Sequence, residues 1–185
     1  MKQIDRDAIR DWDAFTDGIR KATPLDPDMS AADIQRHRKW LEDHPIEWIQ
    51  FFFKEYTEYP FAKFHVRVIL RLIHQEEWYE VLSWSRELAK STVCMFAVMY
   101  LVLTGRKRNI LLISSNKDNA ERLLAPYRGN LEANQRIIAY YGKQQSFGNW
   151  AEDEFITKGR VAFRALGAGQ SPVAAAMKPY GPMYC

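Results

Sequence analysis

The sequence predicts an α/β protein: a helical N-terminal arm followed by the first part of a parallel sheet with flanking helices. Two observations carry this prediction. Residues 1–75 place apolar side chains at helical spacing, whereas residues 76–172 alternate strand-length apolar runs with helical segments. Residues 173–185 follow neither pattern. We therefore divide the chain into a helical region, a partial α/β core and an aberrant tail.

The composition is that of a globular protein. Of 185 residues 47% are hydrophobic, which is ample for one core, and the net charge of +3 is too mild to demonstrate a nucleic-acid partner. Two cysteines exclude a disulfide framework, and the four histidines show no zinc spacing. The longest apolar stretch is about half the roughly 20 residues that a membrane helix needs. We expect a cytoplasmic protein without a membrane partner.

Each helix of the N-terminal region has its own signal. The first is predicted by apolar residues at helical spacing, namely Ile9, Trp12, Phe15 and Ile19. Ser30 is a plausible N-cap for a helix over 31–44. Pro45 is placed to begin a third helix that Pro60 ends, and residues 61–78 carry an apolar face typical of a fourth.

The core is expected to alternate strands and helices. The predicted elements are a short strand over 79–85, a buried helix over 90–103, a strand over 109–116 covered on both faces, an amphipathic helix over 117–131, and a hairpin over 154–167. A strand–helix–strand–helix order at this spacing favours a parallel sheet.

The segment between the first predicted strand and its helix carries the chemistry. A phosphate-binding loop (Walker A motif) needs backbone N–H groups at a helix N-terminus, a Lys for the phosphate oxygens and a Ser or Thr for Mg²⁺. Lys90 and Ser91 stand in those places, but Trp84 and Ala89 replace both glycines of the common pattern. An ordinary strand–loop–helix junction with a lysine at the helix start is the structural alternative.

The string SRELAKST, residues 85–92, resembles the phosphate loop of large terminases, the phage DNA-packaging ATPases. That family's loop contains an arginine near the place of Arg86, and its second glycine is often alanine. The resemblance implies a P-loop NTPase fold, ATP and Mg²⁺ as cofactors, Arg86 as the catalytic residue at the γ-phosphate and Ser91 as the Mg²⁺ contact. The implied nucleotide-binding residues are Ser85, Arg86, Glu87, Leu88, Ala89, Lys90, Ser91 and Thr92, with Thr92 the weaker candidate.

The resemblance extends over about 48–172. Residues 61–73 look like the family's adenine-holding segment, 103–137 like its second strand and helix, and 149–172 like the hairpin before its second nucleotide motif. It implies a motor that packages double-stranded DNA into procapsids in the host-cell cytoplasm, with the small terminase subunit and the portal protein as partners.

Other noticeable residues have simpler interpretations beside functional ones. Ser114 and Ser115 close a strand and are either turn or functional residues. The loop Gly167, Gly169 and Gln170 could sense nucleotide or DNA, although such loops are more often plain connections. The aromatic cluster at 48–53 favours core packing, and the acidic run at 152–154 favours a solvated turn.

The tail lacks family character. The resemblance implies an Arg-Gly-rich turn, then Arg-Pro-Asp and an acidic strand after Pro172, and a neighbouring reading frame of residues 173–185 can encode RGSRNEAVRPDVL. The loss of one base near the Pro172 codon would shift translation from the family-like frame into the frame that encodes residues 173–185. Our hypothesis is a truncated terminase gene, lacking the acidic motif that hydrolysis needs and the nuclease domain, so that this chain is inactive or very weak as an ATPase.

Two other functions compete with this interpretation. One is a non-catalytic helical module that binds DNA or protein, in which the Lys-Ser pair is incidental. The other is a different ATPase of the same superfamily, such as a helicase, which Arg86 disfavours. Nucleotide dependence separates the first of these from the terminase interpretation.

Overall fold

The computed structural model describes residues 3–169, and the tail predicted at 173–185 lies outside them. The described helices are α1 (Gln3–Ala22), α2 (Ala31–Asp43), α3 (Pro45–Phe52), a 3₁₀ turn (Lys54–Tyr56), α4 (Lys63–His74), α5 (Lys90–Leu103), α6 (Lys117–Ala133) and α7 (Gln135–Tyr141). The strands are β1 (Asn109–Ser114), β2 (Gln145–Trp150), β3 (Glu154–Thr157) and β4 (Ala162–Gly167).

The sheet is mixed, with strand order β1-β4-β3-β2. β1 and β4 pair in parallel, whereas β2–β3 and β3–β4 are antiparallel. The predicted hairpin is confirmed as β3 and β4, and β2 was not predicted. The α/β class is therefore confirmed. The expected parallel pairing is found between β1 and β4, whereas the hairpin places β3 antiparallel to β4, so the sheet of the described strands is mixed.

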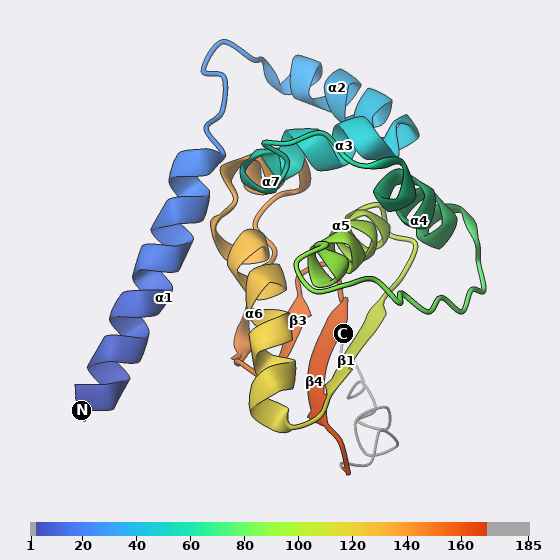
Figure 1. Ribbon diagram of the computed structural model, residues 1–185. Helices are drawn as coiled ribbons and strands as arrows, with labels where there is room; N and C mark the ends of the chain where they lie inside the picture. The colour runs from blue at the N-terminus through green and yellow to red at the C-terminus, as the bar shows by residue number, and fades with distance from the viewer. Residues whose placement is uncertain (1–2, 170–185) are drawn as a thin grey trace, which may run out of the picture.

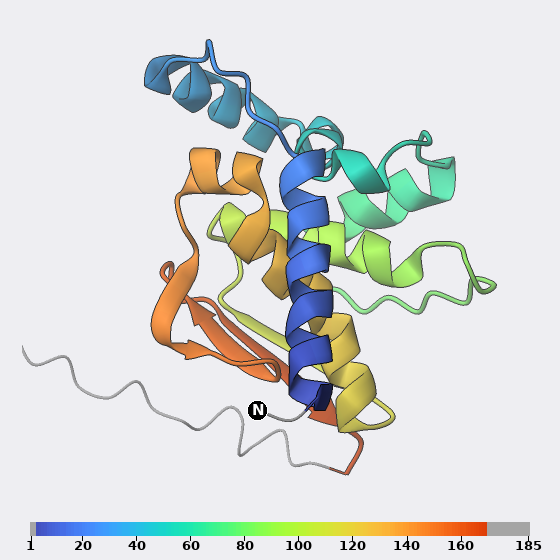
Figure 2. The ribbon, with the colours of Figure 1, turned by 90° about the vertical axis from the view of Figure 1, so that its left-hand side faces the viewer.

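The helices gather on one side of the sheet. α6 packs against β1 and β4, α1 packs on α6, and α5 lies between α4 and α6 (Figures 1 and 2). Helices α2, α3, α4 and α7 form a cap at the end of the molecule remote from the N-terminus (Figure 1). This one-sided arrangement decides which strand residues are covered.

The strand expected over 79–85 does not form, so this prediction is wrong. The segment has no strand partner among residues 3–169, although its burial alternates residue by residue. Leu82 and Trp84 pack against the core, while Tyr79 and Val81 are 87% and 65% exposed. A strand exists only through ladder hydrogen bonds to a neighbour, and no described strand pairs with this segment.

The prediction that β1 is covered on both faces is also wrong for the described residues. Ile110 and Leu112 face the core, whereas Leu111 and Ile113 are 43% and 60% exposed. The reason is that helices cover only one face of the sheet (Figure 2). The other edge of β1 is unpaired within residues 3–169. Among the described residues, β1 therefore exposes both an apolar face and an unpaired edge to solvent.

The N-terminal helices largely follow their signals. Ser30 forms a capping box with Asp33 at the start of α2, and Pro45 begins α3. The expectation that α3 extends to Pro60 is wrong, because Phe53 leaves helical geometry at φ −122° and ψ 43°. That departure lets the rings of Phe53 and Tyr56 pack on Phe96, at centroid distances of 5.2 and 6.1 Å.

One hydrophobic cluster joins the helical cap to the sheet. It contains the fully buried Trp48, Phe52 and Phe53, which confirms that the aromatic cluster at 48–53 is core, and it continues through α5 to Phe155 and Phe163. The division at residue 75 stays a prediction, since apolar packing runs across it.

A buried amide fixes the cap to α6 and α7. Asn134, the N-cap of α7, accepts from the Ile137 amide and donates to the Phe52 carbonyl at 2.8 Å and to Asn130 Oδ1 at 3.1 Å. Its side chain is fully buried. Because unpartnered buried polar groups are costly, this network specifies how the helices meet.

Candidate nucleotide-binding loop

The backbone before α5 takes a conformation that glycine ordinarily provides. Glu87 and Ala89 both have positive φ, 66° and 54°. Ala89 is the N-cap of α5, and among the described residues no side chain caps the first N–H groups of that helix. Left-handed residues beside right-handed ones turn consecutive N–H groups to one side. The loop thus has the backbone character of an anion-binding turn without its glycines.

Lys90 closes this loop. Its Nζ donates to the carbonyl oxygens of Trp84, at 2.8 Å, and Ser85, at 2.7 Å. The ammonium group at the end of the loop is therefore bonded to two neutral carbonyl oxygens at its start. An anion would attract it more strongly than these carbonyls do, because charge-assisted bonds exceed those to neutral groups.

The remaining predicted site residues are mostly accessible. The exposed ones are Ser85, Arg86, Glu87, Leu88, Ala89 and Ser91, and Thr92 is half-buried. Within residues 3–169 Arg86 makes no hydrogen bond or ion pair, so its guanidinium is available to a ligand. The structure joins the Lys90 side chain to the start of the loop, whereas within residues 3–169 the side chains of Arg86 and Ser91 form no hydrogen bond or ion pair with another predicted site residue.

Aromatic rings from α4 form a wall beside the loop. The Trp84 ring lies 4.9 Å from that of Phe64 and 5.4 Å from that of His65, centroid to centroid. His65 Nε2 also lies 3.2 Å from the Leu88 carbonyl. These contacts bring residues of 61–73 next to the loop.

The loop stands apart from the carboxyl ends of β1 and β4, which lie at the start of α6 (Figures 1 and 2). In α/β folds, ligands bind outside the carboxyl ends of parallel strands. In this structure the loop does not follow a strand of the sheet, because residues 79–85 are not paired to β1 or to any other described strand.

The acidic run is engaged in ion pairs at a turn. Glu154 contacts Arg164 at 3.1 Å, and Asp153 contacts Lys117 at 2.8 Å. The Lys117 ammonium lowers the pKa of the Asp153 carboxyl below its ordinary value. These carboxylates stabilise the fold, in keeping with the interpretation as a turn.

Gly167 has a packing reason. A Cβ at this position would lie 2.5 Å from the backbone nitrogen of Lys117 and 2.9 Å from the carbonyl carbon of Asn116, so only glycine fits against the start of α6. Gly169 has φ +89°, and Gln170 lies outside the described residues.

Cys94 lies on α5, and burial raises the pKa of its thiol, which keeps the thiol protonated.

Sequence reasoning missed a second feature, a cavity beside β2. Lys143, Phe147 and Lys158 contribute to its lining. The sequence offered little signal for it, because residues 143–150 contain a single lysine, Lys143, and two aromatic residues, Phe147 and Trp150.

Fold and loop together define a mixed α/β protein with a candidate phosphate-binding turn. No family model, curated protein or solved structure matched the chain. Every helix within residues 3–169 is too short or too polar to cross a bilayer.

Proposed function

We propose that this chain is the N-terminal part of a terminase-like DNA-packaging ATPase and that residues 85–92 bind the phosphates of Mg²⁺-ATP. The observation that carries the proposal is left-handed Ala89, directly before an α5 N-terminus without a side-chain cap, beside a lysine that spans the loop. A helix N-terminus with free N–H groups attracts phosphate.

Individual residues have distinct proposed roles. Lys90 exchanges its carbonyl partners for phosphate oxygens, and the Ser91 hydroxyl contacts Mg²⁺. Arg86, exposed and unpaired within the described chain, approaches the γ-phosphate. Phe64 and Trp84 offer an aromatic wall for the adenine ring.

The metal arrives with the nucleotide in this proposal. Within residues 3–169 no group of three or more His, Cys, Asp or Glu side chains could hold an ion by itself. Bound Mg²⁺ neutralises phosphate charge. With the acidic run engaged in ion pairs at its turn, the chain is expected to bind ATP with very slow hydrolysis.

Fluorescent ATP binding tests this function. With Mg²⁺ present, we expect Lys90→Ala to weaken binding at least tenfold, about 1.4 kcal/mol or more. Lys39→Ala, which removes an exposed lysine from α2, is the matched control and should bind like the parent chain. Equal binding by both variants would contradict the proposal.

The second candidate is a non-catalytic helical module that binds DNA or a protein, whereas double-stranded DNA, the small terminase subunit and the portal protein are the partners proposed for the terminase function. The observation that favours it is the loop's distance from the carboxyl ends of β1 and β4 (Figure 1). In that case Lys90→Ala leaves partner binding unchanged, and ATP does not bind.

A further inference from the structure

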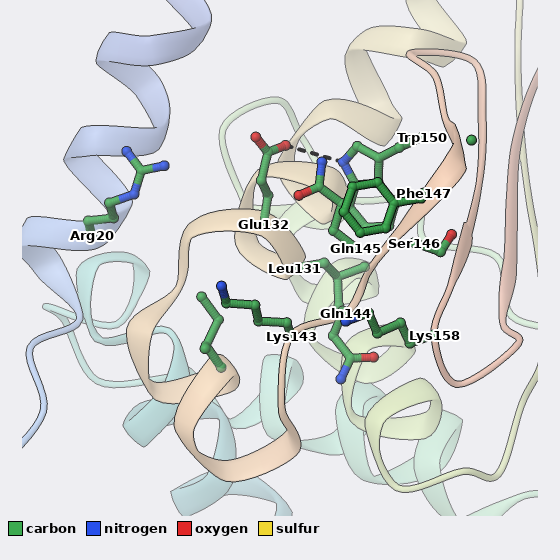
Figure 3. A pocket seen from close by; sticks show the side chains of 12 residues that line it. Arg20, Leu131, Glu132, Lys143, Gln144, Gln145, Ser146, Phe147, Trp150 and Lys158 are labelled. Carbon is green, nitrogen blue, oxygen red and sulfur yellow. Dashed lines mark hydrogen bonds between the residues drawn. The ribbon is translucent and has the colours of Figure 1, made fainter.

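A cavity of about 540 Å³ lies between the end of α1, the end of α6 and strand β2, away from the loop before α5. Figure 3 shows Arg20 reaching toward it from α1, while Lys143 and Lys158 extend toward it from the opposite wall. This volume lies in the range of small-molecule and nucleotide sites, roughly 300–1,000 Å³.

The charge of the cavity favours an anion. Within residues 3–169 the ammonium groups of Lys143 and Lys158 have no hydrogen-bond or ion-pair partner. Arg20 contacts Asp17 at 2.5 Å on its own helix, and Glu132 accepts from Trp150 Nε1 at 3.2 Å. Because Asp17 offsets the charge of Arg20, the two lysines without a described partner face one carboxylate, Glu132, and this net positive charge attracts a phosphate.

An aromatic ring completes the chemistry. Phe147 is fully exposed on β2, which is an edge strand of the described sheet, and Gly148 follows it at φ +84°. A phenyl ring wholly in water contributes nothing to the core. Bases of unpaired nucleic acid stack on such rings, whereas a duplex hides its base faces.

We propose that this cavity binds single-stranded nucleic acid, with a base stacked on Phe147 and neighbouring phosphates on Lys143 and Lys158. The Gln145 amide, which makes no side-chain hydrogen bond within the described residues, is placed in the same lining to contact a base edge. The inference is independent of ATP binding, because no residue of 85–92 lines the cavity.

Fluorescence anisotropy with labelled dT15 tests the proposal at low salt. We expect Phe147→Ala to weaken binding about tenfold, since base stacking is worth about 1–3 kcal/mol. The double variant Lys143→Gln with Lys158→Gln should weaken binding and lower the salt slope by about 1.4, at about 0.7 for each phosphate contact on a single strand. All three side chains are exposed, so the variants should fold, which circular dichroism checks.

Matched control variants distinguish binding at this cavity from binding elsewhere on the surface, and competitors distinguish a single strand from a duplex or a free nucleotide. Tyr79→Ala and Lys39→Gln remove an exposed ring and an exposed lysine elsewhere, and both should bind dT15 like the parent chain, as should Lys90→Ala. Unlabelled duplex and free dTMP should compete poorly. Unchanged binding by the Phe147 and lysine variants, or equal competition by duplex or by dTMP, would overturn the proposal.

Discussion

Residue 89 shows how a phosphate-type turn can form without glycine. An L-residue in the left-handed region costs roughly 1–2 kcal/mol, and Ala89 carries this cost at the start of α5. Alanine bears the smallest side chain that still has a Cβ. The loop therefore keeps its backbone shape at the expense of stability.

Replacing Ala89 measures that strain. We expect Ala89→Gly to raise the free energy of unfolding by up to about 1 kcal/mol, since relief of strain exceeds the added entropy of the unfolded chain. Ala8 is an exposed residue within α1, and the control Ala8→Gly should lower the free energy of unfolding by about 0.5–1 kcal/mol. Urea denaturation distinguishes the two signs, and a loss at residue 89 would contradict the left-handed assignment.

At the element scale, an ion pair ties the start of α6 to the turn between β2 and β3. Lys117 Nζ lies 2.8 Å from Asp153 Oδ2, and both side chains are partly exposed. Because the hydrogen bond from Lys117 lowers the pKa of Asp153, the pair stabilises the fold above the aspartate's ordinary pKa of 3.8. That stability is lost as the pH falls through the lowered pKa.

Asp153→Asn tests this linkage. Its free energy of unfolding at pH 7 should be lower than that of the parent chain by less than about 1 kcal/mol, because the pair is solvent-screened. The difference should shrink once the pH falls below 3.8 and vanish below the lowered pKa of Asp153. Glu58→Gln, an exposed carboxylate without a described partner, should change nothing. A pH-independent difference for Asp153→Asn would contradict the account.

The network at Asn134 makes a stronger prediction at the same scale. Asn134→Ala leaves the Phe52 carbonyl and the Ile137 amide without their partner in a buried place, so we expect a loss of about 2–3 kcal/mol. Asn149→Ala, exposed on β2, should cost little. Thermal unfolding measures both, and equal midpoints would show that the network does not stabilise the fold.

Elements with local signals could be predicted from the sequence. The capping box at Ser30, the proline before α3 and the hairpin around Lys158-Gly159 need only neighbouring residues. The segment 79–85 has strand chemistry but no partner, and a partner is a property of the whole sheet. In the same way, Lys90 and its helix were predicted, whereas the cavity near Phe147 depends on side chains from α1, α6, α7, β2 and the turn after β3.

At the scale of the whole molecule, the described helices cover one face of the sheet. Among residues 3–169 Leu111 and Ile113 are exposed, and one edge of β1 has no strand partner. Exposed apolar faces and unpaired edges promote association. We therefore expect concentrated solutions of the chain to associate through β1.

Ile113→Lys should raise the concentration at which light scattering increases, without lowering the melting temperature, because this side chain adds little to the core. Leu112→Lys is the matched opposite, since Leu112 packs against the core and a charge there should destabilise the fold. Similar destabilisation by both variants would mean that the Ile113 face is covered.

We propose above all that the turn before α5 binds the phosphates of ATP. Amide hydrogen exchange of residues 88–92, measured by NMR with and without Mg²⁺-ATP, tests it most directly. We predict slower exchange at the N-terminal amides of α5 in the parent chain and no slowing in Lys90→Ala. Unchanged exchange at saturating nucleotide in the parent chain would contradict the claim and favour the DNA- or protein-binding module.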